Sequence, residues 1–377
     1  GHAKQINSLD PEGSVYIDDF EGTKGSYDLK FPANSWTLAS TPSGATNKAG
    51  KVMFPEADDL NKLSYGKNRA RLAWYFIEPT LVDPSTGVPD NVKKDPNQHY
   101  IRLIQQQDVF PNKSNNTLQN ALSTLDLAYY PKERGPYNFD PTALDADGKL
   151  TNPADRWAGI MRPIDNSDFE QSNVEFIEFW VMDPFIHNTT SKGGSLYINL
   201  GNISEDLLKD EHKFFENGIT YPKDPGQLDN SVWGYQPKLS QQITRSFDND
   251  PAARAVQDVG YDGLDNEDEK GFFANYLAQV ANTVTNPAAL QAIKDDPSGD
   301  DYHYFRGSDF DQNEPGVLGR YKKFNGPQGN SPVTTDNTAY SSPSTTIPES
   351  EDINRDNTLN EAEDYYQYRI DLSPDMQ

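Results

Sequence analysis

The first part of the chain alternates apolar and polar residues with a period of two, which is typical of β-strands. Two segments, residues 69–78 and 174–182, are apolar on both faces. A strand of this kind belongs in the middle of a sheet that is covered on both sides. Further strands are predicted at residues 14–20, 99–104, 121–130, 195–200 and 365–372.

The apolar period changes to that of a helix after residue 202. Ser204 is a good N-cap, and Asn217-Gly218 is a good stop, so the pattern predicts a helix between them. Asn286 followed by Pro287 predicts the start of another helix, which runs to residue 295. Helices are also predicted at residues 239–247, 251–257 and 269–283, and a long wrapped loop at 297–350.

This order of elements predicts a mainly β protein with an α insertion. The fold class is an antiparallel two-sheet, jelly-roll-like sandwich with an inserted helical and loop region. Residues 5–201 supply the sandwich strands, residues 202–362 form the insertion with its acidic calcium-type loops, and residues 363–377 form a returning terminal strand. We expect the terminal strand to pair with residues 14–20, because a strand that returns after a long excursion needs an early partner.

Composition narrows the functional classes. The 377 residues include 33 basic and 58 acidic side chains, for a net charge of -25, which argues against nucleic-acid binding. There is no cysteine, so thiol chemistry and disulfides are excluded. No apolar run is long enough for a transmembrane helix. Gly1-His2 has the character of a cleavage scar, which suggests a piece of a longer protein.

The strongest candidate site is an acidic loop that leads into the last predicted strand. Oxygen donors occupy positions 1, 3, 5, 7, 9 and 12 of the EF-hand calcium-loop spacing. They are Asp352, Asn354, Asp356, Thr358, Asn360 and Glu363. Asn357 stands at position 6, where the backbone must turn left-handed. The pattern therefore predicts structural calcium, with a solvated acidic turn as the alternative.

A weaker second site is predicted inside the insertion. Its candidate ligands are Asp258, Asp262, Asp265, Asp268 and Glu269. Counting Asp258 as position 1 places Gly263 at position 6 and Glu269 at position 12, but Gly260 at position 3 offers no side-chain oxygen. The alternative is a solvated lead-in to a helix.

Sequence signals for catalysis are missing. The chain has no nucleophile elbow, no metalloprotease motif and no P-loop. Acid pairs such as Asp18/Asp19 or Glu175/Glu178 could serve a glycosidase, but 58 acidic residues make chance pairs common. The sequence therefore predicts no catalytic residues, no organic cofactor and no enzyme activity.

Several long motifs, spread from one end of the chain to the other, resemble the SprA (Sov) family of gliding-motility proteins. They are VYIDDFEGT at 15–23, TLDLAYYPKERGPYNF at 124–139, RWAGIMRPIDNSDFEQSNVEFIEFWVMDPF at 156–185, LGNISEDLLKDEHKFFENGI at 200–219, QDVGYDGLDNEDE at 257–269, YKKFNGPQGNSP at 321–332 and EDINRDNTLNEAEDYYQYRIDL at 351–372.

The resemblance implies a role in the type IX secretion system of Bacteroidetes. Members of this family form the outer-membrane translocon, a very large single-chain β-barrel that works with a PorV-like barrel and a plug protein. It implies that this stretch is a structural module whose partners are the remainder of the barrel, those two proteins and secreted cargo. We expect it at the extracellular face, with the periplasmic face as the alternative.

A glycan-binding jelly roll at the cell surface is the alternative function. The sequence DDFEG followed by Trp36 resembles the opening strand of carbohydrate-binding jelly rolls. Such a module needs a row of exposed aromatic side chains, for which the candidates are Trp36, Trp157 and Trp233.

Overall fold

The computed structural model of the chain describes ten ranges of residues. They are 3–5, 14–16, 26–30, 35–83, 87–112, 121–166, 168–172, 174–238, 245–324 and 347–376. The chain forms two compact units. The small unit comprises residues 1–32, 163–198 and 368–377, and the large unit comprises residues 33–162 and 199–367. Predicted features at residues 17–20, which include Asp18 and Asp19, at 239–244 and at 325–346 lie outside the described residues.

The best-buried strand of the large unit is β4 (Ala70–Tyr75), which pairs antiparallel with β7 (Asp126–Arg134). All six residues of β4 are buried, so the predicted two-faced strand at 69–78 is confirmed. Alternate side chains of β4 enter different core clusters. Trp74 joins the cluster that contains Trp233 and Tyr137, while Tyr75 joins the one that contains Tyr321.

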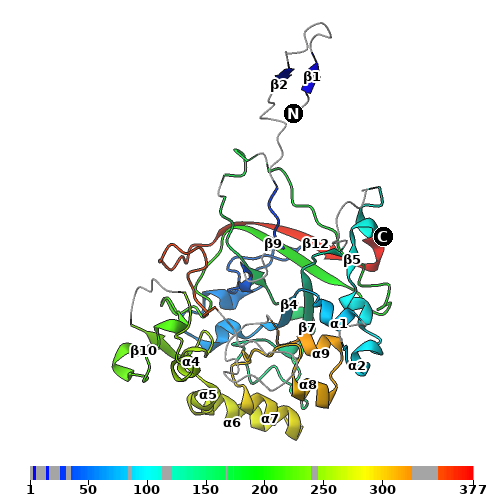
Figure 1. Ribbon diagram of the computed structural model, residues 1–377. Coiled ribbons are helices and arrows are strands. Elements are labelled where there is room, and N and C mark those ends of the chain that lie inside the picture. The colour runs from blue at the N-terminus through cyan, green and yellow to red at the C-terminus, as the bar shows by residue number, and fades with distance from the viewer. Residues whose placement is uncertain are drawn as a thin grey trace. The chain divides into compact units, whose positions relative to one another are not determined.

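The described strands form six sheets of two strands each (Figure 1). Besides β4 and β7, the pairs are β1 (Ala3–Gln5) with β2 (Ser14–Tyr16), β3 (Thr37–Leu38) with β8 (Ile160–Met161), β5 (Ile104–Gln105) with β6 (Ala121–Leu122), β9 (Gly194–Asn202) with β12 (Asp364–Leu372), and β10 (Leu228–Asn230) with β11 (Tyr235–Pro237). These two-stranded ribbons neither confirm nor contradict a two-sheet jelly-roll sandwich. The sandwich, and the domain bounds that depend on it, therefore stay predictions.

The terminal strand has a different partner from the one that we expected. The predicted strand at 365–372 is confirmed as β12, but it pairs with β9, and the two ribbons run side by side in Figure 1. The strand β2 pairs with β1 instead. For residues 14–16, the described part of this predicted strand, the expected pairing is therefore wrong. β9 and β12 both have nine residues, so the two strands match in length.

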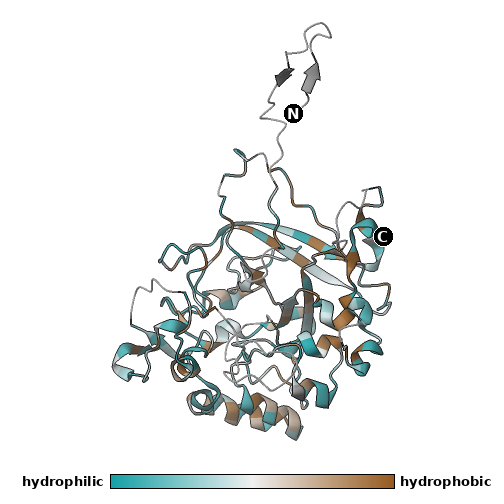
Figure 2. Ribbon diagram, viewed as in Figure 1, coloured by the Kyte–Doolittle hydropathy of each residue, from teal (hydrophilic) through white to brown (hydrophobic). Residues whose placement is uncertain are grey.

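Helices cluster in the large unit between residues 251 and 321. Their bounds are α4 Pro251–Gln257, α5 Asn266–Phe272, α6 Ala274–Thr283, α7 Pro287–Asp295, α8 Ser308–Asn313 and α9 Val317–Tyr321, and three single-turn helices precede them, α1 Pro79–Val82, α2 Asp90–Lys93 and α3 Gln106–Val109. The predictions for 251–257 and 286–295 are confirmed. The segment at 269–283 is helical except at Phe273, where α5 ends and α6 has yet to begin. Asn286 caps α7 by accepting from the N–H groups of Ala288 and Ala289. Apolar residues mark α6 and α7 in Figure 2, and Val280 and Ile293 are buried.

Short 3-10 helices complete the secondary structure. They are η3 Pro55–Asp58, η4 Leu63–Gly66, η6 Gln98–Ile101, η7 Pro153–Asp155, η8 Glu216–Gly218, η9 Pro225–Gln227 and η10 Pro374–Met376. The predicted strand at 99–104 is wrong except at its last residue, because η6 occupies 99–101 and β5 begins only at Ile104. The segment predicted as a wrapped loop contains α8 and α9.

The helix predicted between Ser204 and Asn217 does not form. The carboxylate of Asp206 accepts from the backbone N–H groups of Asp210 at 3.1 Å and Glu211 at 2.9 Å. Those N–H groups would otherwise bond to helical carbonyls, so the side chain competes with the helix. Glu211 also has a φ of 63°, which a right-handed helix does not allow.

The two-faced strand predicted at 174–182 is also wrong. These residues have no regular secondary structure, and Trp180 is 72% exposed. A strand that is apolar on both faces requires covering layers on both sides. The described part of the small unit is too short to provide them.

Candidate metal centres

The acidic loop at residues 352–363 leads directly into β12. Its backbone turns at Arg355 and Asn357, which both have a φ of 66°. The N–H of Asn357 donates across the turn to the carboxylate of Asp352, at 3.2 Å from Oδ2. The left-handed position that the spacing predicts at Asn357 is therefore confirmed.

Asp356 gathers three of the other predicted ligands around its carboxylate. Oδ1 accepts from the N–H of Thr358 at 2.8 Å and from its hydroxyl at 2.5 Å. Oδ2 accepts from the side-chain amides of Asn354 at 3.1 Å and Asn360 at 3.2 Å. The Thr358 hydroxyl, the Thr358 N–H and the Asn360 amide lower the pKa of Asp356 to about 2. Asp356 is therefore an ionised, exposed carboxylate to which a cation has access.

The first and last positions of the loop are held by other groups. Oδ2 of Asp352 lies 2.6 Å from Nη2 of Arg245, so a guanidinium already supplies positive charge there. Oε2 of Glu363 accepts from the N–H of Ser43 at 2.6 Å. The structure thus brings four of the six predicted ligands together, and calcium in this loop stays a prediction.

Glu205 also contacts this loop, and no sequence pattern indicated that it would. Its Oε1 accepts from the N–H groups of Ile353 at 2.9 Å and Asn354 at 3.0 Å. Its Oε2 accepts from the N–H of Asn360 at 3.1 Å and from the side-chain amide at 2.9 Å. Glu205 and Asn360 are 155 positions apart, so only the fold reveals the contact.

Glu351, directly before the loop, holds a second distant segment. Its side chain is buried, with 1% of the residue exposed. Oε1 accepts from the N–H groups of Leu207 at 2.6 Å and Leu208 at 3.4 Å, and Oε2 accepts from the N–H of Phe214 at 2.9 Å. Burial, with the nearby charges of Asp206 and Asp210, raises the pKa of Glu351 well above its usual value. These contacts give Glu351 a structural role in the non-helical segment at 206–214.

Three of the five residues in the second predicted site have partners outside it. Asp258 pairs with Arg254 at 3.0 Å, and Asp268 pairs with Lys223 at 2.6 Å. Asp265 is the N-cap of α5 and accepts from the N–H groups of Glu267 and Asp268. The structure does not bring these three carboxylates to Asp262 and Glu269.

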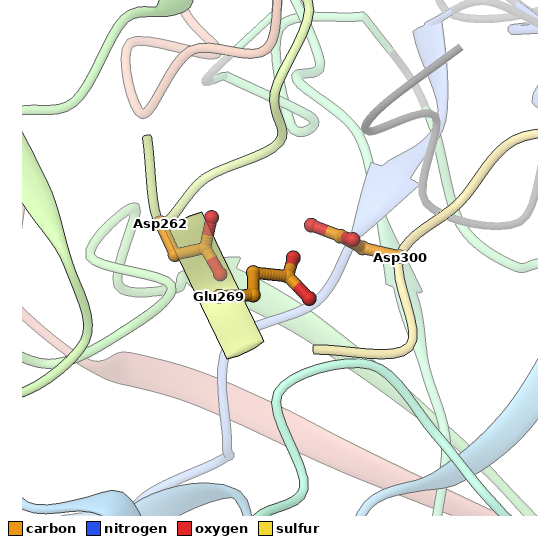
Figure 3. A group of neighbouring side chains, drawn as sticks. All are labelled: Asp262, Glu269 and Asp300. Atoms are coloured by element: carbon orange, nitrogen blue, oxygen red, sulfur yellow. The ribbon is translucent and has the colours of Figure 1, made fainter. Parts of the chain in front are cut away.

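Asp262 and Glu269 instead meet Asp300. One carboxylate oxygen from each of the three residues lies within 4.8 Å of the other two. Each residue is 0% exposed. Figure 3 shows the three carboxyl groups directed toward a common space, Asp262 from the loop before α5, Glu269 from α5 and Asp300 from the segment after α7. We call these three residues the buried triad.

Neighbouring donors fix the buried triad. Ser298 donates its hydroxyl to Oδ2 of Asp262 and its backbone N–H to Oε2 of Glu269, the latter at 3.0 Å. The hydroxyl of Tyr137 donates to Oδ2 of Asp300 at 2.7 Å. The other oxygens of two triad members, Oε1 of Glu269 and Oδ1 of Asp300, have no hydrogen-bond partner among the described residues.

Burial and mutual repulsion act strongly on these carboxyl groups. Burial, followed by the charge of Asp262, raises the pKa of Glu269 to about 9. Burial, followed by a neighbouring triad charge in each case, raises the pKa of Asp262 and of Asp300 well above the usual value. Three buried negative charges cannot persist together without compensation, so the cluster must take up protons or a cation.

Sequence spacing identified two members of the buried triad but missed the third. Asp300 lies 31 positions beyond Glu269 in the numbering, outside any single-loop pattern. The only signal was the acidic run DDPSGDD at 295–301. That run is close to α5 only because the chain turns back after α7.

The aromatic candidates for glycan binding are not a row of exposed rings. Trp233 is fully buried in the core, and Trp36 and Trp157 are half-buried. The ring of Trp157 packs against Phe54, with centroids 5.3 Å apart. These three side chains therefore do not supply the platform that the glycan-binding alternative requires.

Comparison with protein families identifies the last part of the chain. No helix among the described residues is both long and apolar enough to span a membrane. No curated protein sequence matches the chain. Residues 275–377 match the family SprA_N, described as a motility related/secretion protein. The predicted resemblance to the SprA family is thereby confirmed over residues 275–377.

Proposed function

We propose that this chain is a non-enzymatic structural module of the type IX secretion translocon. In this role it supports protein export across the outer membrane and gliding motility. The SprA_N match supports the secretion and motility role. The translocon assignment and the absence of catalysis are the further steps of the proposal.

The observation that carries this proposal is an exposed apolar run in the small unit. Seven large apolar side chains between residues 176 and 186 are 38% to 72% exposed. They are Phe176, Ile177, Phe179, Trp180, Val181, Met182 and Ile186. An exposed apolar surface of this kind marks an interaction site.

The proposed partner of this run is the remainder of the translocon chain. Glu175 and Glu178 lie within or beside the run and are exposed, which disfavours insertion into lipid. A protein surface with apolar pockets and basic groups at its rim satisfies both kinds of side chain. Contacts with the PorV-like barrel, the plug protein and cargo belong to the same proposal.

The roles of the buried carboxylates support a non-enzymatic function. Glu205 and Glu351 both accept backbone N–H groups from segments far away in the sequence. Glu216 likewise accepts from the N–H groups of Val259 at 3.0 Å and Gly260 at 2.7 Å. Acids used in this way join segments of the chain instead of facing a substrate.

The test introduces charge into the apolar run within the full-length translocon in cells. The double variant Phe179→Asp/Ile186→Asp should abolish cargo secretion and gliding, while the melting temperature of the isolated 377-residue chain changes little. Thr189→Asp adds one charge at another exposed position of the small unit and should leave secretion intact. Normal secretion by the double variant would refute the docking role, and a turnover assay that finds a substrate would refute the non-enzymatic one.

The membrane face is tested with the same protein. We propose the extracellular face, because calcium modules outside the cell work at millimolar calcium. An epitope inserted beside exposed Thr189 should then be labelled on intact cells. Labelling only after the outer membrane is opened would favour the periplasmic alternative.

A further inference from the structure

We propose that the buried triad of Asp262, Glu269 and Asp300 binds one calcium ion inside the large unit. The ion would join the loop before α5, α5 itself and the segment after α7. This inference does not depend on the partner of the apolar run, because it concerns residues of the large unit only.

The unpartnered oxygens are the first argument. Oε1 of Glu269 and Oδ1 of Asp300 are buried and have no hydrogen-bond donor among the described residues. The donors around the triad serve the opposite oxygens, Oε2 of Glu269 and Oδ2 of Asp300. A buried carboxylate oxygen without a donor is costly, and a hard cation is the ligand that such oxygens bind.

The surrounding charges are the second argument. The charges that act most strongly on Asp300 come from Glu269, Asp296 and Asp301, which are all acidic. Asp296 already has a cationic partner, because Oδ2 lies 2.8 Å from Nζ of Lys323. Arg71 also interacts electrostatically with Asp300, but its Nη2 donates to the carbonyl of Gly299 at 2.7 Å. A divalent cation would add positive charge directly at the triad oxygens.

The irregular arrangement of the ligands favours calcium over magnesium. Oxygens on opposite sides of a bound calcium ion stand about 4.6–5.2 Å apart, compared with about 4.0–4.2 Å for magnesium. The triad oxygens all lie within 4.8 Å of one another, which is compatible with the larger ion. Calcium also accepts irregular geometry, whereas magnesium demands a near-ideal octahedron and keeps several waters. The buried triad, with carboxylates from three different segments, fits calcium better.

The backbone around the triad lets the carboxyl groups lie close to one another. Gly260 and Gly263, with φ of 73° and 68°, turn the loop that presents Asp262. The N–H of Tyr261 donates to the Tyr137 hydroxyl at 2.8 Å, and this hydroxyl in turn holds Asp300. These contacts position the carboxylates before any ion arrives, which lowers the cost of binding.

The test measures bound metal in the 377-residue chain. Because the triad is buried, the protein is unfolded in chelator and refolded with calcium, magnesium or chelator alone. Wild type refolded with calcium should retain one more calcium ion per chain than Asp300→Asn after extensive dialysis, and magnesium should not replace it. In calcium, Asp300→Asn should melt at a lower temperature than wild type. In chelator it should melt at the same or a higher temperature, because the substitution removes a repelling charge.

Matched variants distinguish calcium at the triad from calcium bound elsewhere on the chain. Asp301→Asn removes the adjacent acid, which contacts Asn266 at 3.1 Å and lies outside the triad, so its calcium count should equal that of wild type. Asp356→Ala reports separately on the loop at 352–363. If Asp300→Asn fails to fold, Glu269→Gln replaces it. Equal calcium counts in wild type and the triad variant would overturn the proposal. So would metal-free wild type, since the carboxyl groups would then be neutralised by protons.

Discussion

Gly260 lies so close to Asp300 that a β-carbon on the glycine would stand 2.1 Å from Oδ2 of the carboxylate. The same β-carbon would stand 2.8 Å from the hydroxyl of Tyr137. Gly260 also has a φ of 73°, which L side chains rarely adopt. Both space and backbone conformation therefore require glycine at the point where the loop packs on the buried triad.

Gly260→Ala should destabilise the large unit. The added methyl group must push Asp300 or Tyr137 out of place while the backbone is strained, and we expect a loss of about 2–4 kcal/mol. Denaturant unfolding monitored by tryptophan fluorescence measures it, since Trp233 lies in the same core. Gly271→Ala is the control, because a β-carbon there meets nothing within 4 Å. Gly271 lies inside α5, so this change should stabilise by about 0.5–1 kcal/mol, and similar effects at the two positions would contradict the packing argument.

Glu351→Ala should be among the most damaging single changes in the acidic region. It leaves the N–H groups of Leu207 and Phe214 buried without acceptors, each at a cost of about 1–3 kcal/mol. Urea unfolding of the variant should show a loss of about 3 kcal/mol or more. Glu175→Ala, at an exposed position of the small unit, should change stability by less than about 0.5 kcal/mol. An equally small effect at Glu351 would show that this carboxylate does not hold the 206–214 segment.

Sequence patterns predicted correctly those helices and strands that are determined by their own residues and the residues next to them. Alternation over 69–78 identified β4, and Asn286-Pro287 identified the start of α7. The segment at 174–182 failed because burial on both faces depends on neighbours that the pattern does not contain. The helix expected after Ser204 failed because the side chain of Asp206 captures backbone N–H groups, a competition that apolar periodicity does not register.

The same distinction applies to the candidate sites. Spacing predicted the left-handed turn at Asn357 and singled out Asp262 and Glu269. It could not supply Asp300 or Glu205, because both reach their sites through the tertiary fold. It also could not show that Arg245 pairs with Asp352, the residue at the first position of the calcium-type loop. Loop spacing identifies oxygen donors, whereas the fold decides which of them are free.

Asp126 should make the stability of the large unit depend on pH. Burial raises its pKa from the usual value near 4 to about 6, although the Thr124 hydroxyl, 2.7 Å away, opposes the shift. Between about pH 4 and pH 6 the folded state keeps a proton that the unfolded state has lost. The contribution of protonated Asp126 to the stability of the folded state is therefore complete below about pH 4 and is lost as the pH rises through 6.

Asp126→Asn should remove that dependence, because the amide stays neutral and can still accept from Thr124. We compare the free energy of unfolding of the variant with that of wild type. The difference should favour the variant by about 2 kcal/mol more at pH 7.5 than at pH 4. Denaturant midpoints at both pH values measure it. Asp155→Asn, at an exposed position, should shift both midpoints equally. A difference for Asp126→Asn that is the same at both pH values would show that burial does not govern this carboxyl group.

Arg245 should compete with calcium for the loop at residues 352–363. Arg245→Met keeps an apolar stem but removes the guanidinium that lies 2.6 Å from Asp352. In chelator the variant should lose about 1–3 kcal/mol, because Asp352 is buried and loses its cationic partner. In calcium that loss should shrink or reverse, since Asp352 becomes available as the first ligand and binding to the folded state stabilises it.

Melting temperatures are compared in the Asp300→Asn background, so that the buried triad does not contribute. Asp356→Ala or Glu363→Ala should each remove most of the calcium effect. An equal loss for Arg245→Met with and without calcium would mean that the loop is a solvated turn held by Arg245 and Glu205 rather than a metal site.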